Sequence, residues 1–423
     1  MRALLKTMLE RAGVATEIPF AVRFADDTEY RNHPQNPEFT LIFRRGRAEW
    51  RTAVLGHIGL IDSYIEGDLD VEGSLPRAFA VGMAARLDTP NPLVGISNRW
   101  HEFRYSNASW EQAKRNARFH YGLGTEFYRL WLDDPYLMYT CAYWKEGTRT
   151  LEAAQQNKID HVCRKVQLGA RDEVIDIGCG FGGFMFRAHE RYGVRVTGLN
   201  NTTEQVEMVR AEIERRRLAG ALDVIDTDFR DVKRQYDKVV SIGVLEHAGR
   251  DQIGEVVRAH AAFLRKGGLG MLHFIGHVGH DDTEYFIRKH IFPGGWIPRL
   301  AEVIVEMERA GLEVIDIENL RRHYALTLDV WAERLERNWE RVHAIDPDRF
   351  NERFRRAWRV YLHGCAEMFR SSIGVTHLFQ IVFAKGNTTR ETYPMSRAFL
   401  YEAEAGSQQR EARRHLRVGG GAE

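Results

Sequence analysis

The segment VIDIGCGFGG, residues 174–183, constrains the fold more than any other part of the chain. A β-rich run leads directly into a glycine turn, and the amphipathic stretch GFMFRAHERY follows. Gly178, Gly180 and Gly182 lack a Cβ atom, so the backbone can turn tightly there and approach a ligand closely. Strand, glycine turn and helix in this order predict the first unit of a doubly wound α/β domain. A purely structural βα turn is the alternative.

Seven β-rich runs predict the sheet of this domain. They are EVIDIG (173–178), RVTGLN (195–200), LDVIDTD (222–228), YDKVVSIG (236–243), LGMLHFIG (269–276), LEVIDIENL (312–320) and LFQIVFAK (378–385). Helix-like stretches lie between the first four runs, which favours crossover connections and mainly parallel strands. Asp176 completes the pattern D-x-G-x-G-x-G, which is typical of methyltransferases and differs from the GxGxxG of dinucleotide enzymes. The predicted fold class is therefore α/β, a Rossmann-like seven-stranded S-adenosylmethionine methyltransferase domain.

Residues at the ends of the second and third predicted strands are candidates for cofactor binding. The second strand ends in GLNNTTEQ, so Asn200 and Gln205 offer amide groups where many nucleotide-binding domains have a carboxylate for the ribose. A helix N-cap at Thr202 or the next residue explains the same stretch equally well, and both explanations can hold together. Asp228 and Phe229 follow the third strand, and we expect them beside the adenine, with Asp228 accepting a hydrogen bond from its exocyclic amine.

Composition narrows the compartment and the partners. A length of 423 residues suits about two domains. The formal net charge of +1 provides no global field for nucleic acid, so no nucleic-acid partner is predicted. Four scattered cysteines form no metal-like pairs, which predicts no metal site and reduced thiols. The start, MRALLKTMLERAG, lacks the apolar core of a signal peptide, and no later stretch suits a bilayer span. We therefore expect a cytoplasmic protein, at most peripheral to the inner face of the membrane.

Changes of pattern along the chain predict three parts. Residues 1–105 form a small N-terminal α/β accessory domain for lipid docking or dimerisation, 106–390 the catalytic domain, and 391–423 a charged, flexible tail. Within the first part, FTLIFRRGRAEWR (39–51) is predicted to be a hairpin that turns at Arg45-Gly46. Its arginines and Trp50 are a candidate lipid-docking surface. A solvated basic turn with Trp50 in the core is the alternative.

A series of motifs resembles those of a known family. These motifs are HYGLGTEFYRLWLDDPYLMYTCAYW, VIDIGCGFGG, SIGVLEHAG, LHFIG, IFPGGWIP, RRHYALTL and YLHGCAEMFR. They occur in the order seen in cyclopropane-fatty-acyl-phospholipid synthases and mycolic acid cyclopropane synthases, from about His120 to Lys385. The earlier stretch GLIDSYIEGDLDVEG resembles the accessory module of the bacterial phospholipid enzymes. The resemblance implies S-adenosylmethionine as cofactor, an unsaturated phospholipid at the membrane surface as substrate, and a possible homodimer.

The resemblance also implies a reaction and the residues that perform it. Methyl transfer from the sulfonium to a cis alkene gives a carbocation, and closing a cyclopropane then requires a base to remove a proton from the new methyl group. In this family the implied base is a bound bicarbonate ion. The implied residues at that site are Cys141, Glu246, His273, the backbone of Ile275, and Tyr324. Donors from His273, Tyr324 and the amide of Ile275 suit the anion's oxygens, while Glu246 can accept its hydroxyl hydrogen.

Further residues match family positions. Cys365 aligns with a cysteine that the family lists as a nucleophile, although alkene methylation needs no thiolate. Tyr139 and Thr140 are expected to hydrogen-bond the methionine end of the cofactor. Taken singly, the implied bicarbonate ligands also fit structural roles: Glu246 as a helix cap and His273 as a core histidine.

Alternatives to cyclopropanation remain at this stage. A different fate of the carbocation gives a methyl- or methylene-branched lipid. A small-molecule N-methyltransferase shares the domain, although a soluble amine has no need of an accessory domain for membrane docking. A non-enzymatic cofactor-binding protein is the reading furthest from the motifs.

Overall fold

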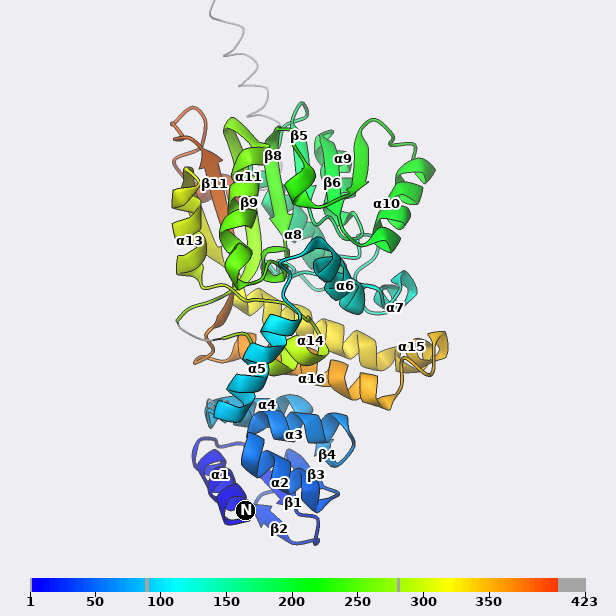
Figure 1. The fold of residues 1–423 in the computed structure, drawn as a ribbon, viewed down its shortest axis with the longest axis vertical. Coiled ribbons are helices and arrows are strands. Elements are labelled where there is room, and N and C mark those ends of the chain that lie inside the picture. The colour runs from blue at the N-terminus through cyan, green and yellow to red at the C-terminus, as the bar shows by residue number, and fades with distance from the viewer. Residues whose placement is uncertain (1, 88–90, 280–281, 402–423) are drawn as a thin grey trace, which may run out of the picture.

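The computed structural model describes residues 2–87, 91–279 and 282–401. At the N-terminus, a four-stranded sheet and the helices next to it form a small α/β module (Figure 1). The strands are β1 (Phe20–Arg23), β2 (Glu29–Arg31), β3 (Phe39–Phe43) and β4 (Leu69–Gly73), in the order β2-β1-β3-β4. The helices are α1 (Arg2–Val14), α2 (Gly46–Leu55), α3 (His57–Ile65) and α4 (Leu75–Ala84).

The hairpin predicted for residues 39–51 is wrong. Only its first half is a strand, β3, and helix α2 begins at Gly46. Strand β3 pairs in parallel with β1 and antiparallel with the later strand β4, so both its edges are occupied without a hairpin partner. Ala48 and Thr52, one helical turn apart, are the buried residues of α2. A helical face therefore covers the module where the sequence suggested a second strand.

The second domain is built on a seven-stranded sheet, as the sequence predicted. Its strands are β5 (Glu173–Ile177), β6 (Arg195–Asn200), β7 (Leu222–Asp226), β8 (Tyr236–Ile242), β9 (Leu264–His277), β10 (Leu312–Asn319) and β11 (Thr376–Lys385). Their order is β10-β11-β9-β8-β5-β6-β7, and only the pairs that involve β11 are antiparallel. Helices α8 (Leu151–Lys165), α9 (Gly183–Tyr192), α10 (Thr203–Arg215), α11 (Ile253–Phe263) and α13 (Leu300–Arg309) cover the two faces (Figure 1).

The strand order reverses between β5 and β8, which places the ligand crevice beyond their carboxyl ends. Short elements gather near this edge of the sheet. They are α6 (Trp110–Tyr121), α7 (Thr125–Arg129), η1 (Phe229–Asp231), η2 (Leu245–His247), η3 (Arg250–Gln252) and α12 (Tyr285–His290).

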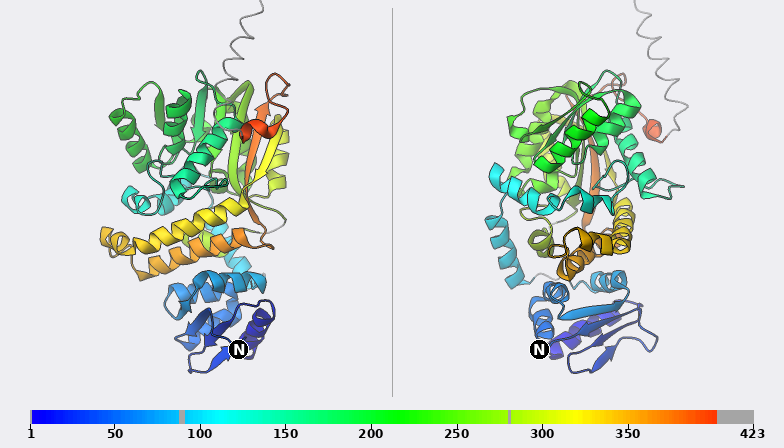
Figure 2. Two further views of the ribbon diagram at one scale, coloured as in Figure 1. Left: turned by 180° about the vertical axis from the view of Figure 1, so that it is seen from behind. Right: turned by 90° about the vertical axis from the view of Figure 1, so that its right-hand side faces the viewer.

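A layer of helices separates the sheet domain from the N-terminal module. It consists of α14 (Arg321–Arg337), α15 (Trp339–Ile345) and α16 (Glu352–Arg370), and α16 packs on α3 and α4 of the module (Figure 2). Arg356 of α16 donates to the carbonyl oxygens of Tyr64 at 3.0 Å and Leu69 at 3.2 Å, and pairs with Asp70 at 2.6 Å. Apolar side chains of the module and of this layer form one continuous core. The module therefore packs firmly against the rest of the chain and is not a separate domain on a flexible linker.

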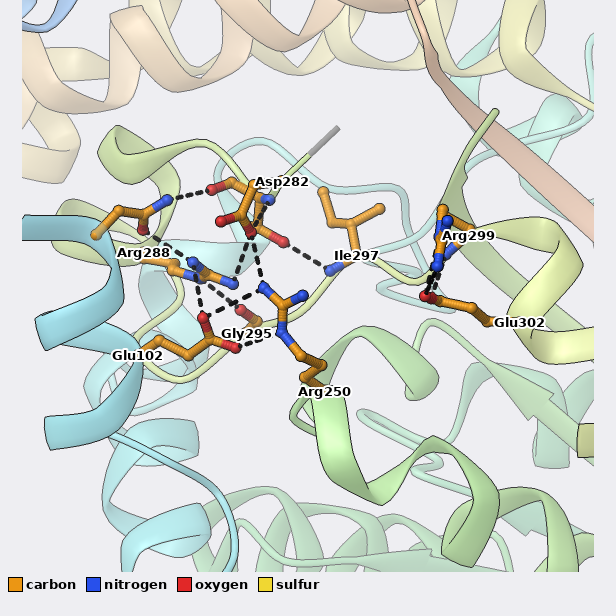
Figure 3. Close-up of polar contacts among 10 residues, drawn as sticks. Glu102, Arg250, Asp282, Arg288, Gly295, Ile297, Arg299 and Glu302 are labelled. Carbon is orange, nitrogen blue, oxygen red and sulfur yellow. Dashed lines mark hydrogen bonds and ion pairs between the residues drawn. The ribbon is translucent and has the colours of Figure 1, made fainter. Parts of the chain in front are cut away.

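Helix α5 (Pro92–Arg104) runs along one flank and connects the module to the sheet domain (Figure 2). Its inner face is fixed by an ionic cluster around Arg288, whose side chain is fully buried (Figure 3). Arg288 donates to Asn98 Oδ1 at 2.9 Å and pairs with Asp282 at 3.3 Å and Glu102 at 3.6 Å. Arg250 pairs with Glu102 at 3.1 Å. The cluster holds α5 against the segment that precedes α12, so one face of this helix packs against the rest of the protein.

The chain end departs from the expected charged tail. Residues 397–400 form the short helix η4, in which Leu400 is buried and accepts a hydrogen bond from Arg164 Nε at 3.0 Å. Arg397 pairs with Asp316 of β10. Packing thus continues to residue 401, whereas the rest of the predicted tail, 402–423, lies outside the described residues. Among the described residues, no helix combines the length and apolarity needed to cross a bilayer.

Candidate active site

The glycine turn between β5 and α9 adopts backbone angles that suit a ligand loop. Gly180 has φ +53° and no atom within 4 Å of the position where a Cβ would stand. At Gly178, with φ +70°, a Cβ would lie 2.3 Å from Val244 Cγ2, which follows β8. The loop is therefore packed tightly against its neighbour strand at Gly178 and open at Gly180, as a cradle for a ligand requires.

The predicted amides at the end of β6 brace this loop. Asn200 Nδ2 donates to the carbonyl oxygen of Gly180 and to Gln205 Oε1, both at 3.0 Å. Asn200 Oδ1 accepts from the backbone N–H of Thr202, which makes no side-chain cap itself. The capping role predicted for a threonine is therefore not made by the Thr202 side chain. Asn200 stabilises the turn before α10 instead and also contacts the cofactor loop. Ribose binding by these amides stays a prediction.

Asp228 and Phe229 lie at the end of β7, where the sequence predicted the adenine. The Asp228 carboxylate accepts from the backbone N–H of Arg230 at 2.9 Å and forms the N-cap of η1. Burial raises the pKa of Asp228. Its role toward the adenine also stays a prediction.

A buried ionisable group behind the loop was missed by sequence reasoning. Lys158 of α8 is fully buried, and its Nζ donates to Thr140 Oγ1 at 2.9 Å. Burial lowers the pKa of Lys158 to about 8, although the nearby Asp133 opposes this shift. Burial also raises the pKa of Asp176 to about 7, and Lys158 opposes that shift. In the sequence, Lys158 looks like an ordinary surface lysine of a helix, and no local pattern reveals that the charge is interior.

Tyr139 lies in a cluster of aromatic side chains and is held at its hydroxyl. Its oxygen lies 3.0 Å from His120 Nε2 and 3.0 Å from the hydroxyl of Tyr361. Trp131, Trp331 and further rings surround it. His120 was a motif residue without a predicted role, and the structure gives it one: it fixes the orientation of Tyr139.

A cavity of about 670 Å³ begins at the carboxyl ends of β8 and β9. All six residues predicted to be catalytic line it, although they come from distant segments of the chain. They are Cys141, Glu246, His273, Ile275, Tyr324 and Cys365. Tyr139, Thr140 and Gly243 line the same cavity beside the cofactor loop. A cavity of this size suits a ligand larger than the methyl group to be transferred.

Glu246 and His273 present complementary polar atoms to this cavity. Glu246 Oε1 accepts from the backbone N–H of Ile275 at 2.6 Å, whereas Oε2 has no hydrogen-bond partner among the described residues. Gln380 Nε2 lies 3.1 Å from His273 Nδ1. With the amide as donor, the imidazole proton is assigned to Nε2, which has no hydrogen-bond partner among the described residues either. One buried acceptor and one buried donor therefore remain for a ligand.

One expectation from the sequence, the role of the Ile275 amide, is wrong. The N–H expected to donate to a bound anion is engaged by Glu246, because the turn of η2 brings this carboxylate against strand β9. Burial raises the pKa of Glu246 to about 7, while the Ile275 N–H opposes the shift. Burial lowers the pKa of His273, which keeps the ring neutral at physiological pH. The site thus contains a carboxyl group that titrates near neutrality beside a neutral imidazole.

The two candidate cysteines are not activated. Cys141 is buried, its Sγ lies 3.2 Å from the carbonyl oxygen of Ala142, and burial raises its pKa. Burial likewise raises the pKa of Cys365 to about 12. Since the thiolate is the nucleophilic form of cysteine, neither side chain is set up for covalent catalysis.

Comparisons with known proteins identify the family of the chain. The family model described as mycolic acid cyclopropane synthetase matches residues 108–381. A probable fatty acid methyltransferase of Pseudomonas putida is 33% identical over 379 residues, which are 87% of this chain and 92% of that protein. The cyclopropane-fatty-acyl-phospholipid synthase of Escherichia coli (strain K12) is 31% identical over 390 residues, 90% of this chain and 92% of that protein.

Solved structures extend the likeness to the fold. The mycolic acid cyclopropane synthase CmaA1, complexed with SAH and CTAB, is 32% identical and superposes with a TM-score of 0.59. The match covers 64% of this chain and 98% of that one. The glycine loop and the six cavity residues predicted to be catalytic lie within residues 108–381. This chain therefore belongs to the mycolic acid cyclopropane synthetase family of S-adenosylmethionine-dependent methyltransferases.

Proposed function

We propose that the chain transfers a methylene group to the cis double bond of unsaturated acyl chains on membrane phospholipids, forming cyclopropane fatty acids. One observation carries the proposal: the polar pair Glu246 and His273 stands in a cavity that is otherwise largely apolar and that also reaches Tyr139 and Thr140, the residues expected at the methionine end of the cofactor. A long hydrocarbon chain suits such walls, since burial of each CH₂ group stabilises binding by about 0.8 kcal/mol. A small polar amine does not.

The free atoms of the pair fit bicarbonate, which has one O–H donor and several acceptor oxygens. Glu246 Oε2 can accept from its hydroxyl, and His273 Nε2–H can donate to one of its oxygens. When bound, S-adenosylmethionine supplies the methyl group and bicarbonate supplies the base.

The chain's own residues then orient and protect the reacting groups. Tyr121, Phe292 and Tyr361 line the cavity near the pair, and aromatic ring faces stabilise positive charge on the acyl chain. Exclusion of water by the buried walls prevents capture of that charge by hydroxide. The neutral thiols of Cys141 and Cys365 avoid methylation of the enzyme itself.

Product analysis tests the proposal directly. Vesicles of unsaturated phospholipid are incubated with the enzyme and methyl-labelled S-adenosylmethionine, and the fatty acids are examined by mass spectrometry and proton NMR. Cyclopropane protons at high field support the proposal. A methyl- or methylene-branched product favours the second candidate, which the name of the Pseudomonas putida relative keeps open. Labelled amines without labelled lipid would contradict both.

The pKa of Glu246 predicts a pH dependence. Accepting a hydrogen bond from bicarbonate requires the carboxylate, which is the major form only above its pKa of about 7. We therefore expect kcat/KM for the lipid to rise with pH through about 7. Burial holds Tyr121 and Tyr324 protonated through raised pKa values, so they do not titrate in this range.

The control for this profile is Glu246→Gln, which keeps an acceptor for the Ile275 N–H but no longer titrates. Its residual kcat/KM is expected to lose the limb near pH 7. Asp176, whose pKa is also about 7, lies at the cofactor loop and is intact in this variant. Lys158, whose pKa is about 8, is intact as well. An unchanged limb in Glu246→Gln would show that a group other than Glu246 titrates and contradicts the prediction.

Contact with the membrane surface is also proposed, but at a different place from the one suggested by the sequence. Arg44 pairs with Asp70, and Arg47 pairs with Asp68, so the basic turn beside Trp50 is locally neutralised. The outer face of α5 offers an alternative. Leu93, Ile96, Trp100 and Phe103 are 56%, 68%, 64% and 83% exposed, respectively. Their spacing of three and four residues puts them on one stripe of the helix.

We propose that this stripe contacts the anionic bilayer surface. Arg99 and Arg104 are exposed on the same helix, so positive charge accompanies the apolar stripe. The opposite face of α5, at Val94 and Asn98, lines the cavity. The helix would therefore place the membrane next to the space that the acyl chain has to enter.

A double substitution tests this surface. Trp100→Asp with Phe103→Asp is expected to weaken binding to vesicles with anionic phospholipid by about 100-fold, because two large side chains no longer enter the interface. Activity on detergent-dispersed lipid should persist. Trp50→Asp is the matched control, since Trp50 is 55% exposed and lies outside the stripe. Unchanged vesicle binding, with a change of oligomeric state in sedimentation, would identify the stripe as a contact between copies of the chain instead.

A further inference from the structure

The cavity extends beyond the active site into the core of the N-terminal module. Its far walls are made by buried side chains of α1 and of the four-stranded sheet. These residues are Leu5, Leu9, Phe20, Phe39, Leu41 and Phe43. Protein interiors are packed as densely as organic crystals, and voids larger than a water molecule are few. A small module that leaves space at the centre of its own core is therefore built to hold something apolar.

A passage between helices connects the two ends of this cavity. On the side of the catalytic domain it is lined by Leu328 of α14 and by Val360 and Gly364 of α16, and on the side of the module by Ala78 and Gly82 of α4. At Gly82 no atom lies within 4 Å of the position where a Cβ would stand, so the passage is open there. At Gly364 of α16 a Cβ would lie 3.3 Å from the Phe79 ring of α4, so the open side of the passage is at Gly82.

We propose that the N-terminal module binds a hydrocarbon chain of the lipid substrate inside its core. The inference rests on the proposed function in one respect, namely that the substrate is a phospholipid. Two sources have the required chemistry: the far end of the acyl chain that reacts at Glu246, and the second acyl chain of the same phospholipid. Leu5, Phe20 and Phe43 make this end of the cavity apolar, which suits either chain better than a charged headgroup. Arg86 of the module also lines the cavity, but it follows the end of α4 and belongs neither to α1 nor to the sheet.

This role explains why the module shares its core with the helical layer. A module that only tethered the enzyme to a membrane would bury its apolar residues against one another. Here the same residues face a continuous space, and α4 contributes both to the passage and to the contact with α16. The module therefore completes the lipid site and does not merely lie beside it.

Photo-labelling by a lipid in vesicles tests the inference on the full chain. The probe is palmitoyl-oleoyl phosphatidylglycerol with a diazirine at the methyl end of the oleoyl chain in one arm and of the palmitoyl chain in the other. We expect labelled peptides within residues 2–87 in at least one arm, and the arm that labels identifies the source. Labelling confined to residues 106–390 in both arms would overturn the inference.

Blocking the passage provides the second measurement. Gly82→Phe places a ring in open space on a helix whose backbone tolerates any residue, and we expect it to reduce labelling of residues 2–87 at least ten-fold. Gly46→Phe is the matched control, because Gly46 also has open space, starts α2 in the same module and does not line the cavity. Equal labelling of wild type and Gly82→Phe would contradict the proposed path.

Measuring the fatty acid products in the same samples separates this inference from the proposed function. Labelling of residues 2–87 without any cyclopropane product would leave the hydrocarbon site standing and remove the proposed reaction. Cyclopropane product with labelling confined to residues 106–390 would support the proposed reaction and remove the hydrocarbon site in the module.

Discussion

Replacing Glu246 by alanine is expected to lower kcat on unsaturated phospholipid by about 10²–10³-fold, the usual loss when one preorganised electrostatic contact is removed from an active site. The substitution removes the free acceptor Oε2 from the cavity and leaves the N–H of Ile275 without its partner. Affinity for S-adenosylmethionine should remain within a few-fold of wild type, because the hydrogen bond of the Glu246 carboxylate is to strand β9 and not to the glycine loop. Turnover on vesicles and calorimetric titration with the cofactor measure the two quantities.

Conservative variants show whether the lost group acts chemically or only holds the fold. Glu246→Gln retains an oxygen for the Ile275 N–H, so its structure and thermal stability should match wild type while kcat stays low. Tyr324→Phe removes one hydroxyl from the same cavity and should also lower kcat without weakening cofactor binding. Normal turnover in a variant with both Glu246→Ala and Tyr324→Phe would remove the bicarbonate proposal.

Replacing Gly180 by valine is expected to weaken cofactor binding by at least about 100-fold. At φ +53° a side chain costs about 1–2 kcal/mol, and more for a β-branched residue that is stiff at χ1. The added methyl groups would also occupy the open space above the loop, where the ligand has to approach. The measurement is the dissociation constant for S-adenosylmethionine by calorimetry.

A matched variant separates backbone strain from obstruction of the ligand. Gly220→Val has the same change at a glycine with φ +87° and open surroundings, but in the turn before β7 and away from the cofactor loop. It should lower the melting temperature by a similar amount and leave the dissociation constant unchanged. Cofactor binding within a few-fold of wild type in Gly180→Val would show that the loop does not hold the ligand.

Local patterns were sufficient to predict the catalytic fold. All seven β-rich runs are strands of one sheet. The central strand β5 is a largely apolar run that is buried on both faces, whereas the edge strand β10 alternates apolar and polar residues and is partly exposed. The turn at Gly178 and Gly180 could also be predicted, since glycines at these spacings indicate the backbone conformation directly. The motif residues could be found for a related reason. The chemistry of an active site restricts which amino acids can occupy it, and the sequence shows the amino acid at each position.

Features that depend on partners far away in the sequence could not be predicted. Residues 47–51 were predicted to be a strand, but the later segment β4 occupies the edge of β3 that a hairpin would have used. The Ile275 amide looked free until η2 was placed against β9. Arg44 and Arg47 looked like a basic surface because Asp68 and Asp70 lie more than twenty residues further on.

Burial is the property that the tertiary structure alone decided. Lys158 and Asp176 carry perturbed pKa values because the surrounding domain removes water from them, and no neighbour in sequence announces this. The cavity through the N-terminal module and the exposed stripe on α5 also depend on tertiary packing, because both are places where the assembled chain leaves side chains without packing partners. The sequence by itself determined the sheet, the cofactor loop and the residue types of the site. Only the assembled chain decided which of those residues lose water, which find partners, and where space is left for a lipid.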